Sequence, residues 1–116
     1  MIKRDLVDKR MSRIVIHGDT VYFAGIVSDD KTLDITGQSK RVLEMAEERF
    51  ALAGISKHDI LRAEVFVKDI YSDFKAFNVI WDEWVSKDTP PARACVEANM
   101  ASPTTLLEII FTASKA

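Results

Sequence analysis

The apolar residues of this chain recur with two different periods, and the changes between them divide the sequence into strands and helices. Short runs rich in Ile, Val, Tyr and Phe show the pattern of half-buried strands, whereas two longer stretches repeat apolar residues every three or four positions. The order of these segments predicts ββαβαββ. We therefore expect an α+β fold, with two helices on one face of a sheet, in a single domain spanning residues 1–116.

The N-terminal part predicts a β-hairpin. Residues 13–17 and 20–24 are apolar and β-branched or aromatic, and the Gly18-Asp19 pair between them is a tight-turn signal. Gly25 is expected to end the second strand. Residues 1–12 are mostly charged and weakly patterned, so we expect them to form an N-terminal arm or an edge strand.

The first helix is predicted from about residue 34 to residue 53. Apolar side chains recur there at helical spacing with charged residues between them, and Gly54 supplies the stop signal. The apolar positions expected to face the core are Val42, Leu43, Ala46, Phe50 and Ala53.

A strand over residues 60–67 and a second helix over residues 72–86, capped within Asp69–Asp73, are predicted next. The Pro90-Pro91 pair forbids helix continuation. An aromatic stripe at helical spacing predicts packing in the core or at an interface rather than a base-stacking platform. Its members are Phe74, Phe77, Trp81 and Trp84.

Two C-terminal strands are predicted over residues 92–100 and 105–113, separated by a turn. Both carry apolar residues on both faces, so something must cover the sheet face that the helices leave free. In a chain of 116 residues, we expect another copy of the same chain to provide this cover.

The bulk composition argues against several classes of function. The net charge of −2 is spread along the chain without a basic run, which disfavours nucleic-acid binding. No apolar run is long enough to cross a bilayer, and no secretory signal is recognisable. A single cysteine fits a reducing cytoplasm. His17, His58 and Cys95 lack metal-type spacing, and no glycine-rich phosphate loop is present, so we expect neither a metal nor a cofactor.

Arg93 is the leading candidate for ligand binding. It begins an apolar, strand-like run directly after the proline pair, and a guanidinium fixed there is a natural fork for the carboxylate of a small metabolite. The alternative interpretation is a structural ion pair with a glutamate of a neighbouring strand. Glu108 lies among leucines and isoleucines, so its semi-buried carboxylate could serve acid-base chemistry or simply pair with a basic residue across an interface. An Arg93–Glu108 pair would satisfy both interpretations.

Several segments together resemble one known family. They are Phe66-Val67-Lys68-Asp69, Asn78 in the second helix, and Pro91-Ala92-Arg93-Ala94-Cys95-Val96 with the later Leu107-Glu108-Ile109. In this order they resemble the YjgF/RidA family of reactive-intermediate (enamine/imine) deaminases. The resemblance implies a chorismate-mutase-like fold, a homotrimer with a barrel of sheets, and clefts between subunits. It also implies cofactor-independent hydrolysis of 2-aminoacrylate-like enamines or imines to 2-keto acids and ammonia.

The resemblance also implies roles for individual residues. Arg93 would hold the substrate carboxylate and Glu108 would place or activate the attacking water. Cys95 would line the pocket through its backbone groups, while Gly25 and Asn78 would shape the cleft. A covalent role for Cys95 is disfavoured because no base lies near it in the sequence.

The chain departs from the archetype in two segments. Archetypal members carry a tyrosine before the first strand, where this chain reads Arg10-Met11-Ser12-Arg13. Their Ser-Gly-Gln signature is replaced by Ala24-Gly25-Ile26. These departures indicate a divergent branch, and the missing tyrosine favours a second hypothesis, a non-catalytic sensor or regulator that binds a 2-keto acid. A third hypothesis, RNA cleavage, is disfavoured by the acidic balance of the chain.

Overall fold

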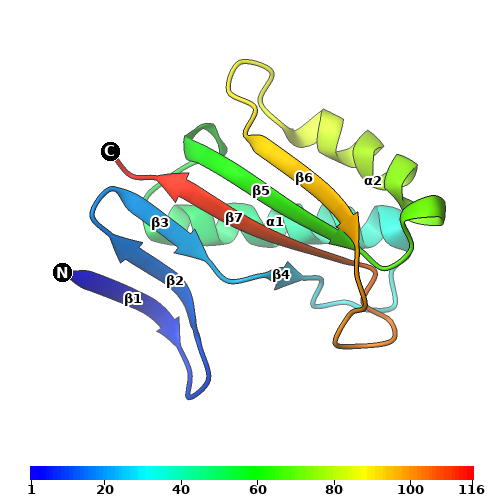
Figure 1. Ribbon diagram of the computed structural model, residues 1–116, viewed down its shortest axis with the longest axis horizontal. Helices are drawn as coiled ribbons and strands as arrows, with labels where there is room; N and C mark the ends of the chain where they lie inside the picture. Colours follow the sequence, from blue (N-terminus) through cyan, green and yellow to red (C-terminus); the bar gives the residue numbers. More distant parts are fainter.

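One seven-stranded sheet and two α-helices build the protein (Figure 1), and the computed structural model describes all residues from 1 to 116. In chain order the elements are β1 (Ile2–Val7), β2 (Ser12–His17), β3 (Thr20–Phe23), β4 (Ile26–Val27), α1 (Ile35–Ala53), a 3₁₀ helix (Lys57–Asp59), β5 (Ile60–Val67), α2 (Ile70–Trp84), β6 (Ala92–Glu97) and β7 (Leu107–Ser114). This confirms the predicted α+β fold, with two helices on a mixed sheet.

The strands lie in the order β1-β2-β3-β7-β5-β6, and the short β4 pairs with the first residues of β7. All neighbouring pairs are antiparallel except β5 and β6, which run parallel. A parallel pair needs a long crossover connection, and α2 supplies it. The strand order places β6 at the edge of the sheet, and α2 lies beside it (Figure 1).

The N-terminal segment forms an edge strand, which decides between the two predicted alternatives. β1 pairs along β2 from Ile2 opposite His17 to Val7 opposite Ser12. The predicted hairpin of β2 and β3 is present, and Gly18 adopts the left-handed backbone of its turn with φ of 60°. Gly is favoured there because it has no Cβ. β4 was not predicted, since a strand of two residues has no detectable period.

The first helix matches its prediction closely. The Asp34 carboxylate accepts a hydrogen bond from the Gly37 amide at 2.9 Å, and Gly54 ends the helix with φ of 77°. All five residues predicted to face the core are at most 3% exposed. Among them, the Phe50 ring lies 5.3 Å from that of Phe23 and 5.2 Å from that of Phe111, both edge-on. This aromatic cluster ties α1 to the middle of the sheet.

The second helix begins and ends two residues earlier than predicted. Asp69 caps it by accepting hydrogen bonds from the amides of Tyr71 and Ser72. The helix ends at Trp84, because the backbone is already extended at Val85. The proline pair therefore lies in the following loop and does not itself stop the helix. Phe77 and Trp81 are buried as predicted, but Phe74 is exposed.

The two C-terminal strands are shorter than predicted, and residues 98–106 form a loop between them. The fully buried side chain of Gln38 holds this loop to α1. Its amide nitrogen donates to the carbonyl oxygens of Leu33 and Thr104 at 3.0 and 2.9 Å, and its oxygen accepts from the Leu106 amide at 2.9 Å. One side chain thus satisfies three backbone groups from two segments far apart in the sequence.

Replacing Gln38 by leucine should lower the free energy of unfolding by about 2–4 kcal/mol, because three backbone groups that contact this fully buried side chain lose their hydrogen-bond partner. Urea denaturation followed by circular dichroism measures this loss. Ser39→Ala is the matched control: Ser39 is equally buried but donates only to the Ile35 carbonyl of its own helix. Equal losses for the two variants would contradict a special role for Gln38.

The sheet face away from the helices has no cover within the chain. In Figure 1, α1 crosses behind the strands, so this open face is toward the viewer. Along β7 the helix-side residues are buried, while the alternate residues are half-buried. Apolar side chains lie among the residues of the open face, namely Tyr22, Phe66, Val96 and Ile110. Cover by another copy of the chain stays a prediction.

Neither helix is both long and apolar enough to cross a membrane.

Candidate functional site

Arg93 is the second residue of β6 and lies on the helix side of the sheet. Its partner across the parallel pair is Ala63 of β5, which is fully buried beneath the helices. Because side chains alternate between the faces of a strand, Arg93 and Cys95 point to this side while Ala92, Ala94 and Val96 point to the other. The edge position of β6 leaves the Arg93 side chain half-buried.

The Arg93 guanidinium is held by three side chains of α2. Its Nη1 donates a hydrogen bond to the Asn78 side-chain oxygen at 2.8 Å. Its Cζ atom lies 5.7 Å from the ring centre of Phe77 and 5.4 Å from that of Trp81. None of the ion pairs in the chain involves Arg93. The predicted alternative, an ion pair with a glutamate of a neighbouring strand, is therefore absent from the protomer.

Cys95 follows Arg93 on the same side and packs against the hydrophobic core. Its Cα partner on β5 is Val65. Burial raises the pKa of the Cys95 thiol, and the positive charge of Arg93 opposes this only in part. The neutral thiol therefore dominates near neutral pH. This disfavours a nucleophilic role for Cys95, and its lining of a pocket stays a prediction.

Glu108 lies on β7 and points to the open face. Its neighbours Leu107 and Ile109 are both fully buried on the helix side, and its cross-strand partners are Val27 of β4 and Phe66 of β5. The carboxylate passes directly over Gly25: a Cβ atom at this position would lie 2.1 Å from Glu108 Oε2. Only glycine leaves room for the carboxylate in this conformation.

A small hollow of about 220 Å³ opens beside Glu108 on the open face. Strands β5 and β7 supply its floor, and the loop that Gln38 anchors supplies one wall. The residues that line it are Phe66, Ala98, Asn99, Met100, Glu108 and Ile110. A protein carboxylate at the edge of a partly apolar hollow suits the placement of a water molecule against a small ligand.

The predicted site residues thus form two groups on opposite faces of the sheet. Asn78, Arg93 and Cys95 come together on the helix side, and Gly25 and Glu108 come together on the open side. Strand β5 lies between β6 and β7, so the two groups are separated by about 10 Å of sheet as well as by its thickness. The Arg93–Glu108 ion pair that the sequence suggested is therefore not formed within the protomer.

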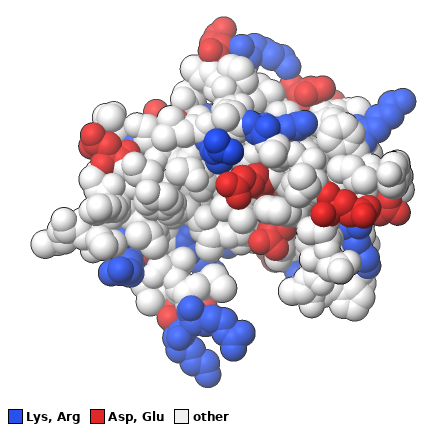
Figure 2. All heavy atoms as spheres, in the orientation of Figure 1, with Lys and Arg blue, Asp and Glu red and all other residues white.

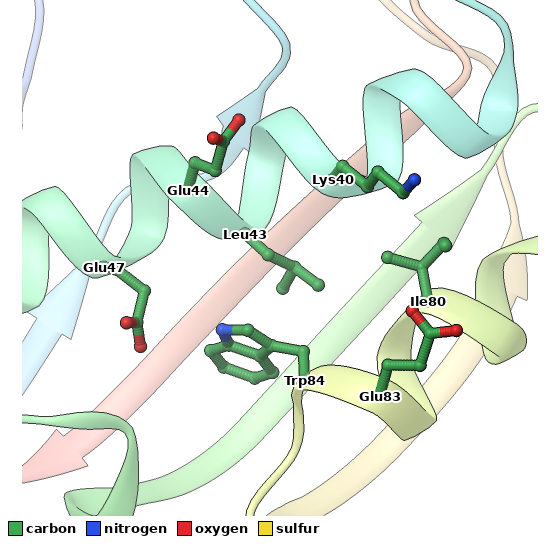
Figure 3. A pocket seen from close by; sticks show the side chains of 7 residues that line it. All are labelled: Lys40, Leu43, Glu44, Glu47, Ile80, Glu83 and Trp84. Atoms are coloured by element: carbon green, nitrogen blue, oxygen red, sulfur yellow. The ribbon is translucent and has the colours of Figure 1, made fainter.

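The largest surface hollow, about 550 Å³, lies elsewhere, between α1 and α2 (Figure 3). None of the predicted site residues lines it. Its lining consists of Lys40, Leu43, Glu44, Glu47, Ile80, Glu83 and Trp84. With three carboxylates against one ammonium group, this hollow disfavours a carboxylate ligand, so size alone does not identify the ligand site.

The sequence interpretation missed two kinds of residue at these groups. Phe77 and Trp81 were predicted only to pack in the core or at an interface, although they contact Arg93 directly. Their spacing around Asn78 on one helix face was the available signal. Asn99 and Met100 line the hollow from a loop, for which no periodic signal exists. No group of three or more His, Cys, Asp or Glu side chains is placed so that it could hold a metal ion.

Comparison with known proteins identifies the family of this chain. Residues 3–115 match the protein family described as Endoribonuclease L-PSP. A RutC family protein of Haemophilus influenzae is 38% identical over 115 residues, which cover 97% of this chain and 97% of that relative. The chain belongs to the YjgF/RidA family. The resemblance stated from the sequence is thereby confirmed.

Two further YjgF/RidA relatives bear on the fold and the site. The crystal structure of a YjgF family member from Neisseria meningitidis matches with a TM-score of 0.95 and 31% identity, covering 100% of this chain and 96% of that one. The 3-aminoacrylate deaminase RutC of Acinetobacter baylyi is 30% identical over 95 residues, covering 77% of this chain and 74% of its own length. The fold of this YjgF/RidA protein is therefore that of the family across the whole chain.

Proposed function

We propose that this YjgF/RidA protein hydrolyses small enamines or imines that carry a carboxylate, such as 2-aminoacrylate, to 2-keto acids and ammonia without a cofactor. The state of Arg93 carries the proposal. Its guanidinium is half-buried, hydrogen-bonded to a neutral amide and without an acidic partner, which suits it to bind a ligand carboxylate. The similarity to the 3-aminoacrylate deaminase RutC of Acinetobacter baylyi supports the reaction class.

The reaction needs few protein groups. An enamine takes a proton at carbon and becomes the iminium, whose C=N carbon is electrophilic. The oxygen of a water molecule bonds to that carbon while Glu108 takes one of the water protons. Transfer of this proton to the nitrogen makes ammonia the leaving group. The C–N bond then breaks as the C=O bond forms, and the hydroxyl proton passes to solvent, which balances the proton that the enamine carbon took from solvent. Arg93 holds the carboxylate, so that the reacting carbon stays within reach of the water.

The working site would lie between two subunits of a homotrimer in the cytoplasm. Arg93 and Glu108 face opposite sides of one sheet, so a ligand of a few atoms cannot contact both in the same protomer. The β6 edge and the partly apolar open face are both uncovered, and contact between copies would bury them. We expect Arg93 of one subunit and Glu108 of its neighbour to complete each cleft.

Mixing two impaired variants tests this arrangement, with the substrate kept well below KM so that the loss in Arg93→Ala is fully expressed. Arg93→Ala and Glu108→Gln proteins are unfolded, mixed and refolded together, and imine loss is followed in a coupled assay. An amino-acid oxidase generates the 2-imino acid in that assay, and semicarbazide traps what remains. With equal mixing, about a quarter of the clefts regain both residues, and activity returns to a similar fraction of wild type. The control is the same two proteins refolded separately and then combined.

The outcomes separate the two parts of the proposal. Recovery only after joint refolding supports a site shared between subunits. The opposite result is an active wild type together with a mixture that contains hybrid oligomers but recovers no activity. That result would place the site within one chain. Wild type that does not accelerate the loss of any of several imines would overturn the deaminase proposal itself.

A second candidate function is binding of a 2-keto acid without turnover, as a sensor or regulator. The segment in which archetypal members carry a tyrosine contains no tyrosine in this chain. Arg13 of this segment forms an ion pair with Asp8, with 2.9 Å between Arg13 Nη1 and Asp8 Oδ2. Loss of one polar group from the cleft would weaken catalysis more than binding. Saturable binding of pyruvate to a protein that turns over no imine would favour this function.

RNA cleavage, which the family description names, finds no support in the charge distribution. The net charge is −2. Figure 2 shows the open face with isolated basic side chains, and the main gathering of them lies at the tip of the β1–β2 hairpin. A groove that binds the phosphate backbone of RNA would need a continuous stripe of basic side chains.

A further inference from the structure

The aromatic contacts of Arg93 form an arrangement that the proposed reaction does not by itself require. Phe77, Asn78 and Trp81 lie within two turns of α2, and all three contact the same guanidinium. Phe77 and Trp81 are buried, and their ring centres lie 6.0 Å apart. The two rings are therefore a rigid part of the core, and the guanidinium lies against them at the edge of the sheet.

This surrounding differs from that of an ordinary structural arginine. A half-buried guanidinium usually compensates for lost hydration by pairing with a carboxylate, which consumes its charge. Here the compensation comes from two aromatic rings and one neutral amide, none of which carries a negative charge. Only one of the five N–H donors of the guanidinium has a protein partner. The charge and the remaining donors stay available.

We infer that Trp81 is a positioning residue: together with Phe77 and Asn78 it holds Arg93 in one conformation, so that the free donors are preset to receive a single ligand carboxylate. This inference rests on the proposed function for the identity of the ligand. The physical benefit is that the long side chain is ordered before the ligand arrives. Binding then does not have to supply the cost of ordering it.

The expected effect is a change in ligand affinity rather than in the chemical step. Trp81→Leu should raise KM for a carboxylate-bearing imine about 3- to 10-fold and change kcat less than twofold. Trp81→Phe should recover most of the wild-type KM, because a ring remains against the guanidinium. Pyruvate binding, measured by calorimetry without any turnover, should weaken by the same factor as KM rises.

Trp84→Leu is the matched control. Trp84 belongs to the same aromatic cluster, with its ring centre 5.2 Å from that of Trp81, but it does not contact Arg93. Both leucine variants lose a large aromatic side chain, from the core at Trp81 and from a partly buried position against the core at Trp84, so any general loosening of the fold affects both. Only the Trp81 variant should weaken pyruvate binding.

A spectroscopic measurement keeps the inference testable if Trp81→Leu fails to fold. In wild type, the NMR signal of the Arg93 Nε–H group, assigned by its loss in Arg93→Lys, should carry a ring-current shift and move on addition of pyruvate. In Trp81→Phe that ring-current shift should change while the protein stays folded.

The outcomes distinguish this inference from the proposed function. Weaker pyruvate binding in Trp81→Leu but not in Trp84→Leu supports the inference, even if no imine is turned over. Equal pyruvate affinity in the Trp81 variants and wild type overturns it, even if imine hydrolysis depends on Arg93. Absence of any pyruvate binding or Arg93 signal change in wild type also overturns it.

Discussion

Replacing Glu108 by glutamine should lower kcat for imine hydrolysis by about 10²- to 10⁴-fold, the range expected for loss of a general acid-base group. Glutamine keeps the size of the side chain and its contacts with Gly25 and the hollow, but it cannot take a proton from water. The coupled oxidase and semicarbazide assay measures this loss directly. We expect KM to change little, because the carboxylate of the substrate is held elsewhere.

Two further variants sharpen this expectation. Glu64→Gln is the matched control, because Glu64 is also half-buried on the open face but does not line the hollow beside Glu108. It should leave kcat within about twofold, as expected for a residue that takes no part in the reaction. Gly25→Ala should impair kcat although Glu108 is present, since its Cβ would displace the carboxylate. A Glu108→Gln enzyme as active as Glu64→Gln would remove Glu108 from the mechanism.

Replacing Arg93 by alanine should lower kcat/KM for carboxylate-bearing imines by about 10- to 100-fold. This range corresponds to loss of a charge-assisted, bidentate contact between the guanidinium and the substrate carboxylate, which contributes about 1.5–3 kcal/mol to binding. The loss should appear mainly in KM. Arg93→Lys should recover only a small part of it, because an ammonium group is a point charge without the planar fork of a guanidinium.

The control for Arg93 is Arg62→Ala. Arg62 lies on the adjacent strand β5 and is exposed, with Ala92 as its cross-strand partner, so the two variants change the net charge equally. Arg62→Ala should leave kcat/KM within about twofold of wild type. If the two variants lost activity equally, the effect of Arg93 would be one of net charge, and a specific carboxylate contact would be ruled out.

The local structure of this chain follows from short-range signals. The Asp34 and Asp69 caps, the Gly54 stop and the Gly18 turn act through backbone groups a few residues away, so the sequence alone predicted their elements closely. The ends of α2 and of the last strands were displaced by a few residues. The boundaries of the last two strands depend on distant contacts, such as the Gln38 side chain that holds the loop of residues 98–106.

The site residues show the same difference between what short-range signals predict and what distant contacts decide. Arg93 and Glu108 stood out because each is a charged residue in an apolar strand, and a resemblance to a family gave each a role. The partner of Arg93 was only partly predictable: Asn78 was expected in the cleft, but its hydrogen bond to Arg93 and the contact with Trp81 arise from the α2 crossover.

By itself, the sequence determined the order of the elements, the helix caps, the core face of α1 and the charged residues worth testing, since all of these depend on neighbours along the chain. Only the tertiary structure decided that Arg93 and Glu108 face opposite sides of the sheet. Alternation within a strand tells which side chains share a face, but not which face that is relative to another strand. That choice depends on how β5 pairs with β6 on one side and β7 on the other, and these contacts join residues far apart in the sequence.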